Sequence, residues 1–502
     1  NVKGGIALIT QSGNFGINLS MQKRGLDIAY IITIGNKACL DLNNYINFLI
    51  NDPRISAIGI HLESINNIHE FSISAIKALK AGKPIVVIKT GQSEQGAAIN
   101  LSHTASLAGE DRLYSALFDR LGIVRCQSIS QFLETLKFLS IVGTLNSNRL
   151  GSMSCSGGEA SLIADYADIA DLKLPKLTKK TKQHLGEILG PKVPLSNPLD
   201  YHTYAWGNHE KLLGCFSAML ENKFDCTILV LDYSSKVSDD AINWKIAENA
   251  LCEASNKTNQ QAVIVSTLPE TMPSHVRDRL KRNGIAPMQG LDDCLFAIKM
   301  AAKIGNRKKQ INQLLPVLKP KKLSGKKNML NEWESKKKLQ SAGLSIPKGE
   351  VCLPNEAAAV AEKIGFPVVL KGLSDSVVHK SEIGAVFIGI MNKESVISAS
   401  NQLAENFQEI LVEKMIESNV AEIIVGINRD QTFGLNLLIG AGGTLVELLD
   451  DTVSLLLPTN KNDIINAIKS LKIFNIIQGF RGEIPGDFNA IVEAIENIAN
   501  FA

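Results

Sequence analysis

The fold is decided by the stretch Gly5-Ile6-Ala7-Leu8-Ile9-Thr10-Gln11-Ser12-Gly13-Asn14, where an apolar run gives way to small polar residues. The apolar part predicts a buried strand, and the polar part opens a helix expected from Gly13 to about Arg24. A helix N-terminus carries free backbone N–H groups and a positive partial charge, so it attracts anions. Ser12-Gly13-Asn14 is therefore a predicted phosphate-binding segment.

The same alternation continues through the first part of the chain. Further strands are predicted at 28–34, 57–62 and 84–89, and further helices at 43–51, 68–81 and 128–139. Continuous apolar strands separated by amphipathic helices indicate a parallel sheet that is buried on both faces. We therefore expect a doubly wound, flavodoxin-like α/β domain over residues 1–147.

The pattern then starts again, which indicates a two-copy repeat. A strand at 150–154 runs into Ser156-Gly157-Gly158, a second predicted phosphate-binding segment. A helix is expected at 161–170, and strands at 226–232 and 262–267 match those at 57–63 and 84–90. We expect a second flavodoxin-like domain over 148–303, followed by a basic linker over 304–327.

Residues 328–502 form a third predicted unit that mixes strands and helices differently. Helices are expected at 332–342, 357–364 and 490–499, and strands at 367–371, 386–390, 410–414 and 422–427.

The loop Leu101-Ser102-His103-Thr104-Ala105-Ser106-Leu107-Ala108-Gly109 places one histidine among small and hydroxylated residues. Such a histidine is either a solvated loop residue or a functional one, because its charge state is easily set near neutral pH. Two predicted phosphate-binding segments favour the second interpretation. A neutral imidazole nitrogen is a competent nucleophile toward phosphorus, so His103 is our candidate phosphate carrier.

Composition excludes several other classes of function. The chain has 53 basic and 50 acidic residues, and a net charge of +3 creates no field that would recruit nucleic acid or an anionic membrane. No membrane-spanning run and no signal peptide are apparent, so we expect a cytoplasmic protein. The eight cysteines include no C-x-x-C pair, which argues against a metal or disulfide framework. Cys155 is interpreted as a small core residue.

Residues 102–109, Ser-His-Thr-Ala-Ser-Leu-Ala-Gly, resemble the phosphohistidine loop of the NDP-forming acyl-CoA synthetases. This family includes the ADP-forming acetyl-CoA synthetases and is distantly related to succinyl-CoA synthetase. The resemblance covers nearly the whole chain and implies that the third unit is an ATP-grasp domain. Its matching segments are Val369-Leu370-Lys371, Val378-His379-Lys380-Ser381, Leu411-Val412-Glu413 and Gly440-Ala441-Gly442-Gly443-Thr444-Leu445-Val446-Glu447.

The resemblance implies a role for each of these residues. The helices at Gly13 and Gly157 would hold the phosphohistidine, Lys371 would contact nucleotide phosphates, and Glu413 would face the adenine or ribose. His379 would be a second phosphorylated histidine that relays phosphate, or a residue that only positions nucleotide.

Glu63 directly follows the strand at 57–62. It lies at the carboxyl edge of the sheet, where doubly wound domains bind ligands. The family has a glutamate at this place, where a carboxylate would orient the imidazole of His103. The alternative is a surface carboxylate without function.

The ligands implied by the resemblance are ATP or ADP, Mg²⁺, CoA and a small carboxylic acid, and a homo-oligomer is compatible with the sequence. The family's N-terminal CoA-binding domain and the metal-binding end of its ATP-grasp domain are not apparent here. Glu447 and Asp451 remain as acidic candidates for Mg²⁺. The competing function is a nucleotide- or acyl-CoA-sensing module of an acetyltransferase-type protein.

Two segments of the second domain keep both a structural and a substrate-binding interpretation. Asn197-Pro198-Leu199-Asp200 is either a turn or a substrate contact. The aromatic segment from Asp200 to Trp206 either lines an acyl pocket or packs a long loop. The identity of the acid does not follow from the sequence.

Overall fold

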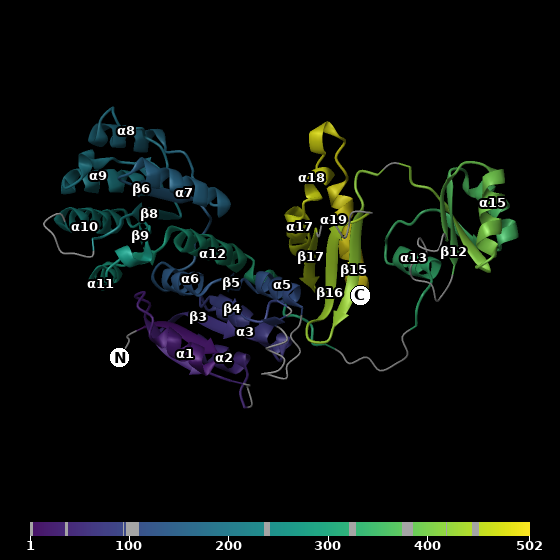
Figure 1. Cartoon of the computed structure of the whole chain (residues 1–502), viewed down its shortest axis with the longest axis horizontal. Coiled ribbons are helices and arrows are strands. Elements are labelled where there is room, and N and C mark those ends of the chain that lie inside the picture. Colours follow the sequence, from purple (N-terminus) through teal and green to yellow (C-terminus); the bar gives the residue numbers. More distant parts are fainter. Residues whose placement is uncertain are drawn as a thin grey trace. The chain divides into compact units, whose positions relative to one another are not determined.

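A computed structural model describes residues 4–35, 39–93, 95–96, 110–234, 241–320, 328–373, 385–417, 419–443 and 451–502 (Figure 1). The chain divides into two compact units, Asn1–Pro316 and Val317–Ala502. No helix in the described part of the chain is long and apolar enough to cross a membrane.

The first sheet of unit 1 is parallel and has the strand order β2-β1-β3-β4-β5. Its strands are β1 Gly5–Thr10, β2 Ile28–Thr33, β3 Ile55–Leu62, β4 Ile85–Lys89 and β5 Val124–Cys126. The helices among them are α1 Gly13–Ser20, α2 Leu42–Ile50, α3 Ile68–Lys80, α5 Asp111–Leu121 and α6 Ile129–Ile141. The predicted doubly wound domain is confirmed.

Helix α1 ends earlier than the sequence predicted, at Ser20 instead of near Arg24. The Gln22 side chain accepts a hydrogen bond from the backbone N–H of Arg24 and donates one to the carbonyl of Leu26. Gly25 then adopts a φ of 77°, in the left-handed region. These local bonds stabilise a turn in place of the last helical turn.

The second sheet of unit 1 has the order β10-β9-β8-β6-β7. Its strands are β6 Leu150–Ser154, β7 Leu199–Asp200, β8 Cys226–Val230, β9 Ala262–Ser266 and β10 Ala286–Gln289. Its helices are α7 Gly157–Ile169, α8 Lys179–Leu189, α9 His209–Leu220, α10 Ala241–Thr258, α11 Ser274–Arg282 and α12 Leu291–Lys309. Numbered within each sheet, both sheets read 2-1-3-4-5, which is the flavodoxin-like order and confirms the repeat.

Two boundaries differ from the sequence prediction. Helix α7 begins at Gly157, within the segment predicted to bind phosphate, and not at residue 161, because hydropathy does not mark its glycine-rich first turn. Helix α12 runs to Lys309, so the start of the predicted linker is helical. Gly305 packs so closely on Leu145 that a Cβ would lie 1.8 Å from the Leu145 carbonyl oxygen. The division between the two flavodoxin-like domains at 147 and 148 stays a prediction.

A buried carboxylate joins the two halves of unit 1. Glu134 of α6 is fully buried, and its Oε1 accepts hydrogen bonds from Arg24 at 3.1 Å and from Lys137 at 2.9 Å. Its Oε2 accepts the backbone N–H of Gln289 in β10 at 3.0 Å. Lys137 is also fully buried. The second sheet is therefore tied to a helix of the first.

Unit 2 contains two antiparallel sheets. The four-stranded sheet has the order β11-β14-β12-β13, and the three-stranded sheet the order β15-β16-β17. The strands are β11 Gly349–Cys352, β12 Val368–Leu373, β13 Val386–Ile390, β14 Glu409–Lys414, β15 Ile423–Asp430, β16 Gly434–Ala441 and β17 Thr452–Leu456. The helices are α13 Glu332–Ser341, α14 Ala357–Ile364, α15 Lys393–Ala404, α17 Lys461–Ser470, α18 Phe474–Ile477 and α19 Phe488–Phe501.

Strands β11, β16 and β17 were not predicted. The end of β16 lies within the glycine-rich segment, which reads as a loop from composition alone. Gly440 belongs to the sheet because it pairs with Thr452, and a Cβ at Gly440 would lie 2.7 Å from the Thr452 side chain. Close approach of neighbouring strands therefore explains a glycine inside this strand.

We predict that Glu134→Ala lowers the free energy of unfolding by about 3 to 5 kcal/mol, because it leaves the Lys137 ammonium buried without its carboxylate. Chemical denaturation monitored by circular dichroism would measure the loss. The control is Lys303→Met, which removes the exposed ion pair with Asp119 and should cost less than about 1 kcal/mol. Similar losses in the two variants would contradict the prediction.

Candidate functional site

The start of α1 is an exposed helix terminus with a fixed cap. Ser12 Oγ accepts the backbone N–H of Phe15 at 3.3 Å, and Thr10 Oγ1 donates to the Ser12 carbonyl at 3.0 Å. A Cβ on Gly13 would meet nothing within 4 Å, so the first helical turn faces open space. An anion would therefore find accessible N–H groups and the positive end of the helix dipole.

The buried Gln11 side chain helps to hold Glu63 beside this helix start. Gln11 accepts hydrogen bonds from the backbone N–H groups of Glu63 and Ser64, and its Nε2 donates to the Ser64 carbonyl at 3.1 Å. Gln11 directly precedes Ser12, so the ends of β1 and β3 are fastened together. This is the switch point at which flavodoxin-like sheets bind ligands. The carboxylate of Glu63 makes no hydrogen bond or ion pair with another described residue.

Two buried titratable groups lie at the same edge. Lys89, the last residue of β4, is 2% exposed, and its Nζ lies 4.7 Å from the centre of the Tyr114 ring. Burial lowers the pKa of Lys89 to about 8, although the charges of Asp111 and Glu63 oppose the shift. Burial, with a contribution from Lys89, lowers the pKa of His61 to about 4. At neutral pH the edge therefore holds a cation and an uncharged imidazole.

The sequence analysis missed Gln11, His61 and Lys89. Each lies at or near the end of an apolar strand, where a polar side chain is a weak signal of function. His103 lies outside the described residues, between β4 and α5 in the sequence.

The second predicted phosphate-binding segment repeats the backbone geometry of the first with different surroundings. Ser154 Oγ donates to the Ser156 carbonyl at 3.0 Å, as Thr10 does to Ser12. Gly157 and Gly158 start α7 and are exposed. A Cβ on Gly157 would lie 3.3 Å from Asp200 Oδ2, so a carboxylate lies beside this helix start.

Two further carboxylates lie near Asp200. Glu159 Oε2 is buried and has no hydrogen-bond partner among the described residues. Burial, together with the charges of Asp232 and Asp200, raises the pKa of Glu159 to about 7. Asp232 occupies the position that corresponds to Glu63, but it accepts hydrogen bonds from Thr267 and Thr271. The two helix starts therefore differ in charge.

Several side chains of the two ambiguous segments have structural partners. The Asn197 side chain accepts the backbone N–H of Ser152 at 3.0 Å and donates to the Leu150 carbonyl at 2.9 Å, so it fixes a turn. Tyr201 is fully buried, and Trp206 packs edge-on against Trp244. Cys155, expected in the core, is half-buried, and burial raises its pKa.

Lys371 and Glu413, predicted at different parts of a nucleotide, form an ion pair between neighbouring strands. Lys371 Nζ lies 3.0 Å from Glu413 Oε2 and 2.6 Å from Glu332 Oε1. Lys336 also binds Glu413, at 2.6 Å. Burial opposes the charged form of Lys371, but Glu332 and Glu413 raise its pKa. The sequence analysis missed Glu332 and Lys336, which belong to a charged helix without a motif.

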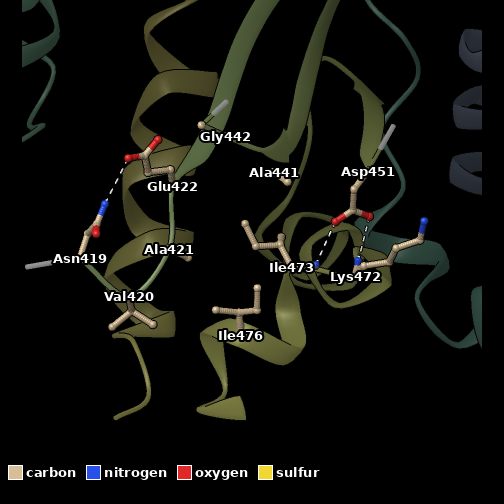
Figure 2. A pocket seen from close by; sticks show the side chains of 11 residues that line it. Asn419, Val420, Ala421, Glu422, Ala441, Gly442, Asp451, Lys472, Ile473 and Ile476 are labelled. Atoms are coloured by element: carbon tan, nitrogen blue, oxygen red, sulfur yellow. Dashed lines mark hydrogen bonds between the residues drawn. The ribbon is translucent and has the colours of Figure 1, made fainter. Parts of the chain in front are cut away.

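A pocket of about 730 Å³ lies at the other sheet of unit 2 (Figure 2). Gly442 and Gly443 of the predicted glycine-rich segment line it. The other lining residues are Asn419, Val420, Ala421, Glu422, Ala441, Asp451, Lys472, Ile473 and Ile476. Mostly apolar walls with a few polar groups at the rim are typical of small-molecule sites.

Each carboxylate oxygen of Asp451 already accepts a hydrogen bond in this pocket. Its two oxygens accept the backbone N–H groups of Lys472 at 2.8 Å and Ile473 at 2.9 Å, as Figure 2 shows. Both carboxylate oxygens therefore hold backbone N–H groups, which argues against Asp451 as a magnesium ligand. Glu447 and His379 lie outside the described residues.

Comparisons with protein families agree with this architecture. A family model described as a succinyl-CoA ligase-like flavodoxin domain matches residues 3–139. A second, described as an ATP-grasp domain, matches residues 321–502. Together with the two flavodoxin-like sheets and the antiparallel unit, these matches define an ATP-grasp protein of the succinyl-CoA ligase type.

Individual relatives narrow the class. An ADP-forming acetate–CoA ligase of Methanocaldococcus jannaschii is 28% identical over 99% of this chain and 74% of its own length. The beta subunit of ADP-forming acetate–CoA ligase I of Pyrococcus furiosus is 32% identical over 34% of this chain and 78% of its own length. The chain therefore belongs to the family of ADP-forming acyl-CoA synthetases.

A solved structure shares the fold. The dinucleotide-forming acetyl-coenzyme A synthetase 1 of Ca. Korarchaeum cryptofilum, in complex with phosphate and ADP, superposes with a TM-score of 0.56. It is 23% identical, and the match covers 63% of this chain and 68% of that one.

The buried His61 predicts an acid-sensitive stability. Its pKa falls from 6.5 in the unfolded chain to about 4 in the fold, so only the unfolded state gains the proton between these values. The free energy of unfolding should therefore drop by about 3 kcal/mol as pH falls from about 6.5 to about 4. Denaturant titrations across this range should show the slope in the wild type and in the exposed-site control His275→Gln. The prediction is wrong if His61→Gln keeps the same slope.

Proposed function

We propose that His103 carries the phosphoryl group in the reaction acid + CoA + ATP ⇌ acyl-CoA + ADP + phosphate. The chain is an ADP-forming acid–thiol ligase of the acyl-CoA synthetase family. The acid is first converted to an acyl phosphate, because a free carboxylate is a poor electrophile. The imidazole takes the phosphoryl group from ATP and passes it to the acid, and CoA thiol then displaces it from the acyl phosphate as inorganic phosphate.

One observation supports placing the acyl phosphate half-reaction at this edge of the first sheet. The Gln11 side chain joins Glu63 to the start of α1. The helix start supplies N–H groups for the phosphoryl oxygens, and Glu63 supplies a carboxylate without a partner among the described residues. That carboxylate would bind the second ring nitrogen of His103 and stabilise the imidazolium charge that develops on phosphorylation. Buried Lys89 adds positive charge at the same edge.

The second helix start would complete this phosphate site. Ser156, Gly157 and Gly158 offer backbone N–H groups in the geometry of the first copy. The carboxylates there would oppose an anion if all were ionised. The raised pKa of Glu159, about 7, means that this group carries a proton for part of the time at neutral pH and weakens the repulsion.

In the proposed nucleotide site, Lys371 would neutralise phosphate charge, and Glu413 would hold the Lys371 side chain in place. His379 would relay phosphate between nucleotide and His103, with nucleotide positioning as the alternative role. Mg²⁺ would be held by nucleotide phosphates and protein carboxylates, of which Glu447 remains a candidate. When bound, the metal would neutralise charge on the transferring phosphoryl group.

A sensing module of an acetyltransferase-type protein is the less favoured function, because a relative matched over 99% of this chain is an acetate–CoA ligase. CoA, nucleotide and a small carboxylic acid are the proposed ligands. The cytoplasmic location and a homo-oligomer stay predictions.

We predict that the enzyme incubated briefly with γ-labelled ATP and Mg²⁺ forms an acid-labile, base-stable phosphoenzyme, as expected for phosphohistidine. Peptide mapping should place the label on His103, and His103→Asn should abolish it. Retention of full label in His103→Asn would reject His103 as the carrier. Circular dichroism of the variant controls for folding.

We predict that Glu63→Gln keeps the fold but slows phosphorylation of His103 by about 100-fold or more, the scale of a lost base or charge partner. Rapid-quench measurement of labelled enzyme gives the rate. The matched control is Glu70→Gln, an exposed carboxylate in the first turn of α3. An unchanged rate in Glu63→Gln would show that Glu63 is only a surface carboxylate.

A further inference from the structure

Helix α13 places two side chains against the strands that carry Lys371 and Glu413. Glu332 and Lys336 are four residues apart, so they lie on one face of the helix. Lys336 Nζ donates to Glu413 Oε1 at 2.6 Å and to Glu413 Oε2 at 2.7 Å, and it lies 2.9 Å from Glu332 Oε1. Lys371 Nζ bridges the same two carboxylates.

The four groups form a closed ring in which cations and anions alternate. Glu413 is the least accessible member, with 3% of its side chain exposed, whereas the other three are between 21% and 26% exposed. A buried carboxylate is strongly unfavourable unless it is paired. Two lysines share this task here, and the summed charge of the ring is zero.

We propose that Lys336 is a positioning residue of the nucleotide site, whose ammonium neutralises Glu413 so that the charge of Lys371 remains available to nucleotide phosphate. This inference rests on the proposed function of Lys371. Lys371 has three N–H donors, and the two carboxylates occupy two of them, which leaves one for a phosphate oxygen.

The summed charge of the ring shows why Lys371 alone is insufficient to neutralise both carboxylates. Without Lys336, the three remaining groups of the ring, Glu332, Glu413 and Lys371, carry a summed charge of −1 beside a polyphosphate. Without both Lys336 and the charge of Glu332, the cluster is neutral again. A charge-compensating role therefore predicts rescue by a second substitution, which a purely structural role of Lys336 does not.

The test is the dissociation constant of ADP, measured by titration calorimetry on the whole chain. Lys336→Met should weaken binding by about 10- to 100-fold, the scale of hydrogen bonds to charged groups. Lys336→Arg should stay close to the wild type. The matched control is Lys338→Met, which removes an exposed lysine of the same helix and should leave affinity unchanged.

The double variant Lys336→Met/Glu332→Gln separates the explanations. Charge compensation predicts that its ADP affinity returns toward the wild type, and affinity as low as or lower than in Lys336→Met would overturn the inference. If Lys336→Met fails to fold by circular dichroism, the neutral double variant carries the test. It should then bind ADP far more tightly than Lys371→Met.

Lys371→Met also separates this inference from the proposed function. If Lys371→Met binds ADP as the wild type does, the assignment of Lys371 to nucleotide fails. If Lys371→Met binds weakly while Lys336→Met is unaffected, the assignment stands and only the role of Lys336 is wrong.

Discussion

The hydrogen bonds of the buried Gln11 side chain are the interaction on which the proposed phosphoryl site depends. The order 2-1-3-4-5 makes β1 and β3 neighbours, but it does not set how the segments after them lie. Gln11 sets this by binding the backbone of Glu63 and Ser64 from the residue before the α1 cap. A carboxylate and a helix N-terminus, which would otherwise belong to two separate loops, thus become parts of one site.

The two copies of the flavodoxin-like fold carry different charged side chains at the same edge of the sheet, the carboxyl ends of the strands. Thr10 and Ser154 make equivalent bonds to the cap residues, so backbone geometry is retained. The first copy places a buried lysine beside Glu63, whose carboxylate makes no hydrogen bond with another described residue. In the second copy the carboxylate corresponding to Glu63 is Asp232, which is engaged by two threonines and leaves a partly protonated Glu159 nearby. A repeat in topology is therefore not a repeat in chemistry.

The strand–helix alternation of unit 1 was predictable because parallel strands buried on both faces are continuously apolar, as in Ile55–Leu62. Exposed helix starts at Gly13 and Gly157 were predictable from small polar residues after such strands. Strand β16 was not, since Gly440 reflects close strand packing that composition does not distinguish from a loop. The pairing of Lys371 and Lys336 with Glu332 and Glu413 could not be predicted either, because it joins segments far apart in sequence through contacts that no local pattern records.

Both proposed phosphate sites place a lysine near carboxylates, but the pKa values of the two lysines shift in opposite directions. At Lys89 burial dominates, and its pKa falls to about 8 despite Asp111 and Glu63. At Lys371 the hydrogen bonds that the ammonium donates to Glu332 and Glu413 outweigh burial, and the pKa rises. An ion pair in contact thus fixes the charge at the nucleotide end, whereas the charge at the acyl end depends on neighbours without direct bonds. As pH rises past 8, Lys89 therefore loses its proton before Lys371 does.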